Sequence, residues 1–94
     1  MKTEYKYIKF VPTVLVGHWN CLNRKSETVL GSVSYYKPWR QFVFEPDELG
    51  DIIFNSSCLR DIAHFLDQLN AQKQIDINKA KQKAPAASER NNSQ

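Results

Sequence analysis

Residues 34–44 read SYYKPWRQFVF, and the rest of the chain is organised around this stretch. Five of its eleven residues are aromatic, and aromatic side chains favour strands. Pro38 fixes its backbone φ and has no N–H to donate, so the Lys37-Pro38 pair favours a tight corner. The stretch therefore predicts a β-hairpin with Lys37 and Arg40 beside its corner.

Segments upstream of the hairpin alternate in the way that strands do. Residues 13–22 predict a strand, residues 23–26 a polar turn, and residues 28–36 the strand that enters the corner. Residues 5–11 predict an edge strand, because Pro12 then interrupts the ladder of hydrogen bonds. Gly17 and Gly31 mark either a bulge or a place where an aromatic ring lies across bare backbone.

Downstream of the hairpin, the spacing of apolar residues predicts a helix. Asn55, Ser56 and Ser57 offer side-chain oxygens for an N-cap, so the helix should begin near Cys58. Residues 52–54 either add a short strand or fill the core. The predicted apolar stripe consists of Leu59, Ile62, Ala63, Leu66 and Leu69, widened by Cys58 and Phe65.

These elements predict an α+β fold: an antiparallel meander of three to four strands packed against one C-terminal helix. We assign residues 1–71 to a single domain and residues 72–94 to a flexible, basic tail. Few large apolar residues occur in the tail, so it cannot offset the entropy of ordering.

Charge changes sign twice along the chain, although the net charge is only +3. Residues 1–40 carry seven Lys or Arg and two acidic residues, residues 41–67 carry one and six, and residues 68–94 carry five and two. The pattern indicates either a strongly dipolar molecule or three independently solvated surfaces.

Residues that could perform catalysis or bind a metal are few. His18, Cys21, Cys58 and His64 are the only histidines and cysteines, and their spacings on a strand and a helix do not converge as zinc ligands do. The three glycines are scattered, so no phosphate loop is present. We expect a non-enzymatic protein without metal or cofactor.

No apolar run reaches the roughly 18 residues that span a bilayer, and the two cysteines do not suggest a disulfide framework. The sequence therefore predicts a cytoplasmic protein that does not bind a membrane.

A resemblance to small proteins of bacteriophages and prophages covers about residues 18–69. It rests on the pattern of residues 31–44, on Ile53-Phe54-Asn55, and on Cys58-Leu59-x-Asp61-Ile62-x-x-Phe65-Leu66. The resemblance implies a compact accessory protein and brings no established activity. The order of three strands and a helix is also similar to the arm-site DNA-binding domains of phage-type integrases.

Three functions follow as expectations. The first is nucleic-acid binding through a basic, aromatic sheet face, with cations on phosphates and aromatic rings on bases. The second is a protein-binding module that modulates or inhibits a host protein, and the third is a homodimeric structural protein. The predicted nucleic-acid-binding residues are Arg24, Lys25, Tyr36, Lys37, Trp39 and Arg40.

Overall fold

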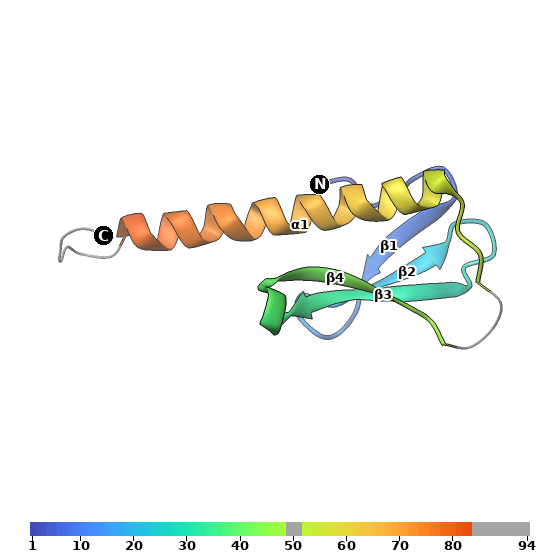
Figure 1. Ribbon diagram of the computed structural model, residues 1–94, viewed down its shortest axis with the longest axis horizontal. Coiled ribbons are helices and arrows are strands. Elements are labelled where there is room, and N and C mark those ends of the chain that lie inside the picture. The colour runs from blue at the N-terminus through green and yellow to red at the C-terminus, as the bar shows by residue number, and fades with distance from the viewer. Residues whose placement is uncertain (49–51, 84–94) are drawn as a thin grey trace.

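A computed structural model describes the backbone of residues 1–48 and 52–83, and the side chains of residues 1–48 and 52–74. Four antiparallel strands follow one another in chain order, and one helix lies across one face of the sheet (Figure 1). The predicted α+β meander is thereby confirmed. The elements are β1 (Ile8–Pro12), β2 (Trp19–Asn23), β3 (Val29–Tyr36), the 3-10 turn η1 (Lys37–Trp39), β4 (Gln41–Pro46) and α1 (Ser56–Lys83).

The predicted corner is the link between β3 and β4. Pro38 lies in the first turn of η1, where its missing N–H removes no helical hydrogen bond. Arg40 ends the turn in the left-handed region, with φ 54°, and its N–H donates to the carbonyl of Lys37 at 3.1 Å. Tyr36 then stands opposite Gln41, which fixes the register of the hairpin.

Residues 13–18 form a loop, so the strand predicted over 13–22 is wrong for its first six residues. The Thr13 hydroxyl accepts from the N–H of Leu15 at 3.1 Å, and the Thr13 N–H donates to the carbonyl of His18 at 2.9 Å. These local bonds compete with a strand ladder. Gly17, with φ 77°, turns the chain back towards β2.

Cross-strand partners share a face of the sheet, so the register assigns each strand residue to a side. Phe10, Cys21 and Gly31 lie in one row on the helix-covered face, and Trp19, Val33 and Phe44 lie in the next. On the open face, Asn20, Ser32 and Glu45 form a row, and Lys9 stands beside Leu22.

The core lies between the sheet and α1 and is built on Phe65. Its ring stacks on Phe10 with centroids 3.9 Å apart, and Trp19 meets it edge-on at 5.1 Å. Such rings bury much area per residue, which a domain of this size requires. The buried residues of the core are Tyr5, Ile8, Phe10, Cys21, Val33, Cys58, Ile62, Phe65 and Leu69.

The buried stripe of α1 is displaced from the predicted one. Cys58, Ile62, Phe65 and Leu69 are buried, whereas Leu59 is 54% exposed and Ala63 is also exposed. The helix begins with the predicted cap, since the Asn55 side chain accepts from the N–H of Cys58 at 2.8 Å. α1 is therefore rotated so that Leu59, Ala63 and half-buried Leu66 lie at the margin of the core.

Gly31 combines both roles that the sequence leaves open. The register between β2 and β3 shifts at Cys21 and Leu22, which is a bulge beside Gly31. A Cβ on Gly31 would also lie 2.5 Å from the Phe44 ring and 2.5 Å from the carbonyl oxygen of Glu45. An aromatic ring therefore lies across the bare backbone of this residue.

Both edges of the sheet have cover. The N-terminal segment folds along β1, where the N–H of Phe10 donates to the carbonyl of Thr3 at 2.8 Å. On β4, the N–H of Phe42 donates to the side chain of Asn70 at 2.7 Å, and Pro46 has no N–H to offer. These contacts occupy β1 at Phe10 and β4 at Phe42, two positions at which another strand would pair.

After β4, residues 52–54 take the second of their two predicted roles, and α1 extends into the segment predicted as a tail. Within residues 52–54, Phe54 packs edge-on against Phe44 at 5.7 Å and Ile53 is exposed, so this run contributes to the core without pairing. α1 continues through residues 72–83, which we predict as the start of the tail. Residues 84–94 lie outside the described residues.

Candidate nucleic-acid interface

Four of the six predicted binding residues lie together at the β3–β4 corner. Tyr36 and Trp39 meet edge-on with centroids 5.1 Å apart, and they are 43% and 66% exposed. Lys37 and Arg40 are exposed on the same turn. Within the described side chains, neither cation takes part in an ion pair.

A third cation reaches this corner from α1. The Lys73 ammonium lies 4.3 Å from the centroid of the Tyr35 ring, and Tyr35 packs edge-on against Phe42 at 5.5 Å. An aromatic face attracts a cation and holds it in place. We define the corner surface as Tyr36, Lys37, Trp39, Arg40 and Lys73.

Arg24 and Lys25 lie at the opposite end of the sheet, in the turn between β2 and β3. β3 joins the two ends, and its eight residues at about 3.3 Å each put them about 25 Å apart. The six predicted residues therefore form two groups and not one surface.

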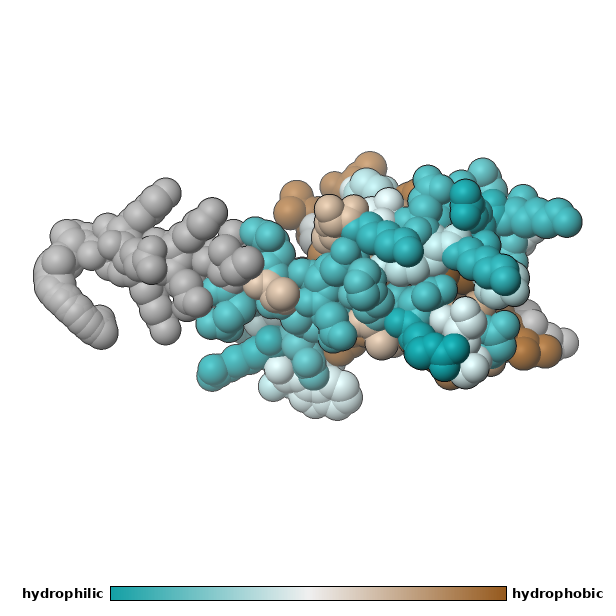
Figure 2. Space-filling model, turned by 90° about the horizontal axis from the view of Figure 1, so that it is seen from above, coloured by the Kyte–Doolittle hydropathy of each residue, from teal (hydrophilic) through white to brown (hydrophobic). Residues whose placement is uncertain are grey.

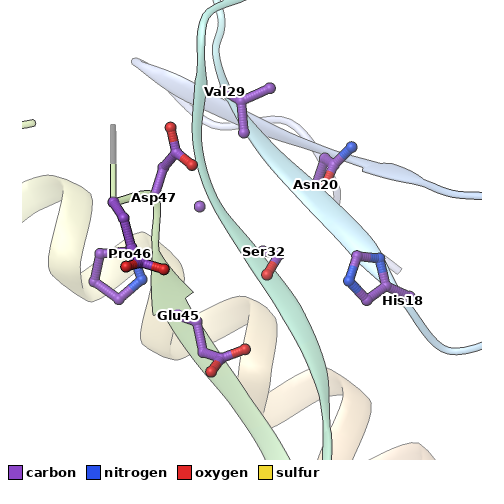
Figure 3. Close-up of a pocket in the computed structure, with 9 residues that line it drawn as sticks. His18, Asn20, Val29, Ser32, Glu45, Pro46 and Asp47 are labelled. Atoms are coloured by element: carbon purple, nitrogen blue, oxygen red, sulfur yellow. The ribbon is translucent and has the colours of Figure 1, made fainter. Parts of the chain in front are cut away.

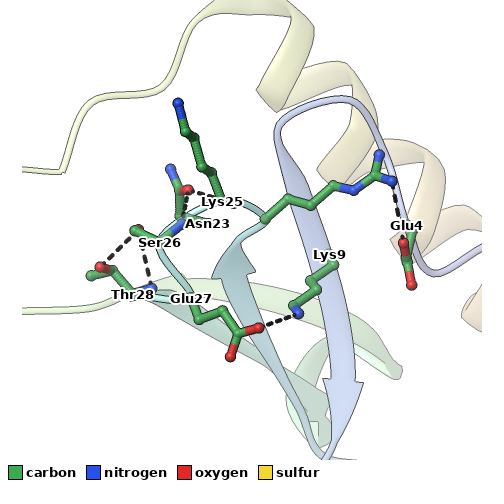
Figure 4. A network of polar contacts seen from close by, with 8 residues as sticks. Glu4, Lys9, Asn23, Lys25, Ser26, Glu27 and Thr28 are labelled. Carbon is green, nitrogen blue, oxygen red and sulfur yellow. Dashed lines mark hydrogen bonds and ion pairs between the residues drawn. The ribbon is translucent and has the colours of Figure 1, made fainter.

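The β2–β3 turn is held by its own polar contacts (Figure 4). The Arg24 guanidinium donates to the carbonyl of Tyr5 at 3.0 Å and lies 3.6 Å from the Glu4 carboxylate. Glu27, with φ 62°, forms an ion pair with Lys9 at 3.0 Å. Arg24 is thus engaged within the protein, whereas the Lys25 side chain is exposed.

The open face of the sheet is neither basic nor rich in aromatic residues. Of the six aromatic residues in the strands, only Tyr36 belongs to this face by register. Lys9 is the one basic residue in the four strands, and it is paired with Glu27. The alternation of the strands puts the other aromatic rings against α1.

A shallow concavity of about 790 Å³ lies on this open face (Figure 3). Ser32 of β3 lies between His18 and Asn20 on one side and Glu45 of β4 on the other. Asp47 and Glu48 continue its wall, so three carboxylates border it. Carboxylates repel phosphate, which makes this face unsuitable for a nucleic-acid backbone.

A second hollow, of about 380 Å³, runs between β4 and α1 beside the corner surface. We call it the β4–α1 groove. Its walls are largely apolar, and Gln41, Asp67 and Asn70 add polar groups. Its lining residues are Trp39, Gln41, Phe42, Val43, Phe44, Ala63, Leu66, Asp67 and Asn70.

The histidines and cysteines take part in structural contacts. The Tyr5 hydroxyl lies 2.8 Å from His64 Nδ1, and burial, followed by the negative charge of Asp61, raises the pKa of Tyr5. Burial raises the pKa of the Cys21 thiol to about 12, and the neighbouring Cys58 adds to the rise. A thiol that stays protonated is a poor nucleophile.

Seen from the helix side, hydrophilic residues cover α1 and hydrophobic surface lies at the margins of the molecule (Figure 2). Within the described part of the chain, no helix is long and apolar enough to cross a membrane.

Comparisons with known proteins give no match: no family model, no curated protein and no solved structure is similar to this chain.

Sequence reasoning misses Lys73 and the β4–α1 groove. Lys73 follows Asn70 and Leu66 at helical spacing, which could have indicated that it lies on the same side of α1. The groove has no such signal, because it depends on the rotation of α1 over the sheet.

Proposed function

We propose that the protein binds nucleic acid through the corner surface, as a small non-enzymatic accessory protein of bacteriophage type that acts in the cytoplasm. The observation that carries the proposal is the 66% exposed Trp39 between two cations that have no ion-pair partner in the described part of the chain. Exposed aromatic rings stack on bases, and Lys and Arg bind phosphates.

Further support comes from the distribution of charge. Lys73 adds a third cation at the corner, and Lys79, Lys81 and Lys83 follow it in the sequence of α1. α1 extends past the corner end of the sheet (Figure 1). Nucleic acid bound at the corner would thus lie near a basic helix and away from the three carboxylates of the open face.

The test is a fluorescence-anisotropy titration of the full-length protein with labelled oligonucleotides at about 50 and 200 mM salt. Affinity should fall as salt rises, because phosphate binding releases counterions. Lys37→Ala and Arg40→Gly should each weaken binding and lower the salt slope by about 1. Glycine suits position 40, because it adopts a positive φ without strain.

Lys25→Ala is the matched control, since it removes an exposed lysine from the opposite end of the sheet. Binding should be unchanged in this variant. An affinity that does not respond to salt would contradict nucleic-acid binding, and an equal loss in Lys25→Ala would contradict the corner as its site.

A second candidate function, protein binding, rests on the loop at residues 13–18. Val14, Leu15 and Val16 are 99%, 63% and 105% exposed, and the Thr13 hydrogen bonds hold the loop in shape. Three consecutive exposed apolar residues are unusual unless they serve a contact. A stoichiometric partner retained from host lysate after nuclease treatment, and lost in Val14→Ser/Val16→Ser, would support this function.

Homodimerisation by strand pairing has less support, because Asn70 and Thr3 bond to the outer strands. Light scattering that gave a dimer mass at micromolar concentration would revive it.

A further inference from the structure

We infer that the ligand of the corner surface is single-stranded nucleic acid, and that one unpaired base enters the β4–α1 groove beside Trp39. The inference rests on the proposed function and adds the class of nucleic acid and the place of the base.

The β4–α1 groove has walls that suit a nucleobase. Phe42 and Phe44 of β4 and Leu66 of α1 provide apolar walls, and the exposed Trp39 borders one end. A nucleobase has apolar faces and a polar edge. Such walls suit its faces, since stacking on aromatic residues does not depend on which base is bound.

Polar groups of the groove can bind the edge of a base. Asn70 uses its side-chain oxygen to accept from Phe42, so its amide NH₂ remains a donor for the edge of a base. On the α1 side of the groove, the Asp67 carboxylate accepts. The groove therefore has hydrogen-bonding groups for a base edge that is not already paired.

The charges around the groove complement a nucleotide. Lys37 and Arg40 flank Trp39 in the sequence, and Lys73 lies one helical turn beyond Asn70. Lys73 is connected to the groove through Tyr35 and Phe42, whose rings are in contact. A base in the groove would have its own phosphate near these cations, while Asp67 is the one carboxylate among the lining residues.

The geometry favours a single strand over a duplex. In a duplex each base is stacked on both faces and paired at its edge, so a recessed groove can take it only after it is flipped out. A single strand avoids this cost. The acidic wall of the open face also offers no track for a second phosphate backbone.

The experiment compares a labelled DNA strand of about 12 nucleotides with the same strand annealed to its complement, using the full-length protein. The single strand should bind at least about tenfold more tightly than the duplex, and Trp39→Ala should weaken single-strand binding by about tenfold. Trp39→Tyr should retain most of the affinity, because a tyrosine ring also stacks.

A second variant tests the groove itself. Ala63→Leu places a larger side chain in the groove from an exposed helix position and should lower single-strand affinity several-fold. Ala71→Leu is the matched control, because it makes the same change at an exposed position of α1 that does not line the groove. It should bind as the wild type does.

The outcomes separate the two proposals. Equal affinity for single strand and duplex, or an equal loss in both on Trp39→Ala, would overturn the groove and leave phosphate binding at the corner. Equal losses in Ala63→Leu and Ala71→Leu would overturn it as well. If neither the single strand nor the duplex bound in a salt-sensitive way, the proposed function and the groove would both be overturned.

Discussion

At the scale of single residues, a few positions are determined by close contacts that other residues could not make. Gly31 is the clearest, because the Phe44 ring and the carbonyl of Glu45 occupy the space of a side chain. Cys21 is fully buried between the sheet and α1, and its thiol has an altered pKa. Substitution of each of these two residues should change stability in its own way.

Gly31→Ala should lower the free energy of unfolding by about 1–3 kcal/mol, because the new Cβ would overlap a backbone oxygen and an aromatic ring. Urea denaturation followed by circular dichroism measures this. The neighbouring change Ser32→Ala, on the open face, should cost less than about 0.5 kcal/mol. Equal effects of the two substitutions would contradict the packing of Phe44 on Gly31.

The pKa of Cys21 predicts a loss of stability at high pH. An ordinary thiol has a pKa of 9.0, and burial raises that of Cys21 to about 12. Between these two pKa values the unfolded chain loses a proton that the folded protein retains. The contribution of the Cys21 thiol to stability is therefore fully present below pH 9.0 and is lost as pH rises above it. When the free energy of unfolding is measured from about pH 8 to 10.5, it should fall less steeply with pH in Cys21→Ala than in the wild type. Identical slopes in the two proteins would refute the raised pKa of Cys21.

At the scale of elements, the rotation of α1 about its axis decides which of its aliphatic residues are buried. Leu59 and Ile62 both belong to the stripe that the sequence predicts, yet Ile62 is 5% exposed and Leu59 is 54% exposed. The rotation puts Leu59 outside the core and opens the flank that forms the β4–α1 groove.

Alanine substitutions should distinguish these two positions. Ile62→Ala should cost about 2–5 kcal/mol, since it removes a buried side chain and leaves a cavity. Leu59→Ala should cost less than about 1 kcal/mol, because most of the side chain is already in water. Denaturant unfolding of both variants is the measurement, and similar losses would indicate that Leu59 is also buried.

At the scale of the whole molecule, the two ends of the sheet differ in their contacts and exposure. The β2–β3 end is held by the contacts of Arg24 and Lys9, and the corner end presents Trp39 and cations without ion-pair partners in the described part of the chain. α1 connects the ends, because its first turns lie over the core and Asn70 and Lys73 contact the corner strands.

This connection predicts where the chain can be shortened. Truncation after Leu69 removes Asn70 and leaves the N–H of Phe42 without its partner, which should cost about 1–3 kcal/mol. It also removes Lys73 from the Tyr35 ring. Truncation after Gln74 keeps both contacts, so it should melt at a higher temperature than the truncation after Leu69. Equal melting temperatures for the two truncations would show that Asn70 is dispensable.

The kinds of elements and their order follow from local signals in the sequence. The aromatic run around Pro38, the cap at Asn55 and the apolar spacing of α1 are local signals, and local signals depend on neighbours in the chain. They sufficed for the β3–β4 hairpin, the helix start and the α+β class, and they singled out Tyr36, Lys37, Trp39 and Arg40.

Which side of each element meets the core depends on contacts between residues far apart in the chain. The loop at residues 13–18 depends on hydrogen bonds of the Thr13 hydroxyl, which outweigh an alternating pattern that a strand would also satisfy. The rotation of α1 follows from the stacking of Phe65 on Phe10, two residues far apart in the sequence. Five of the six strand aromatics lie on the helix side of the sheet and not on the open face. Packing against the helix removes their apolar area from water, whereas the open face would leave it exposed.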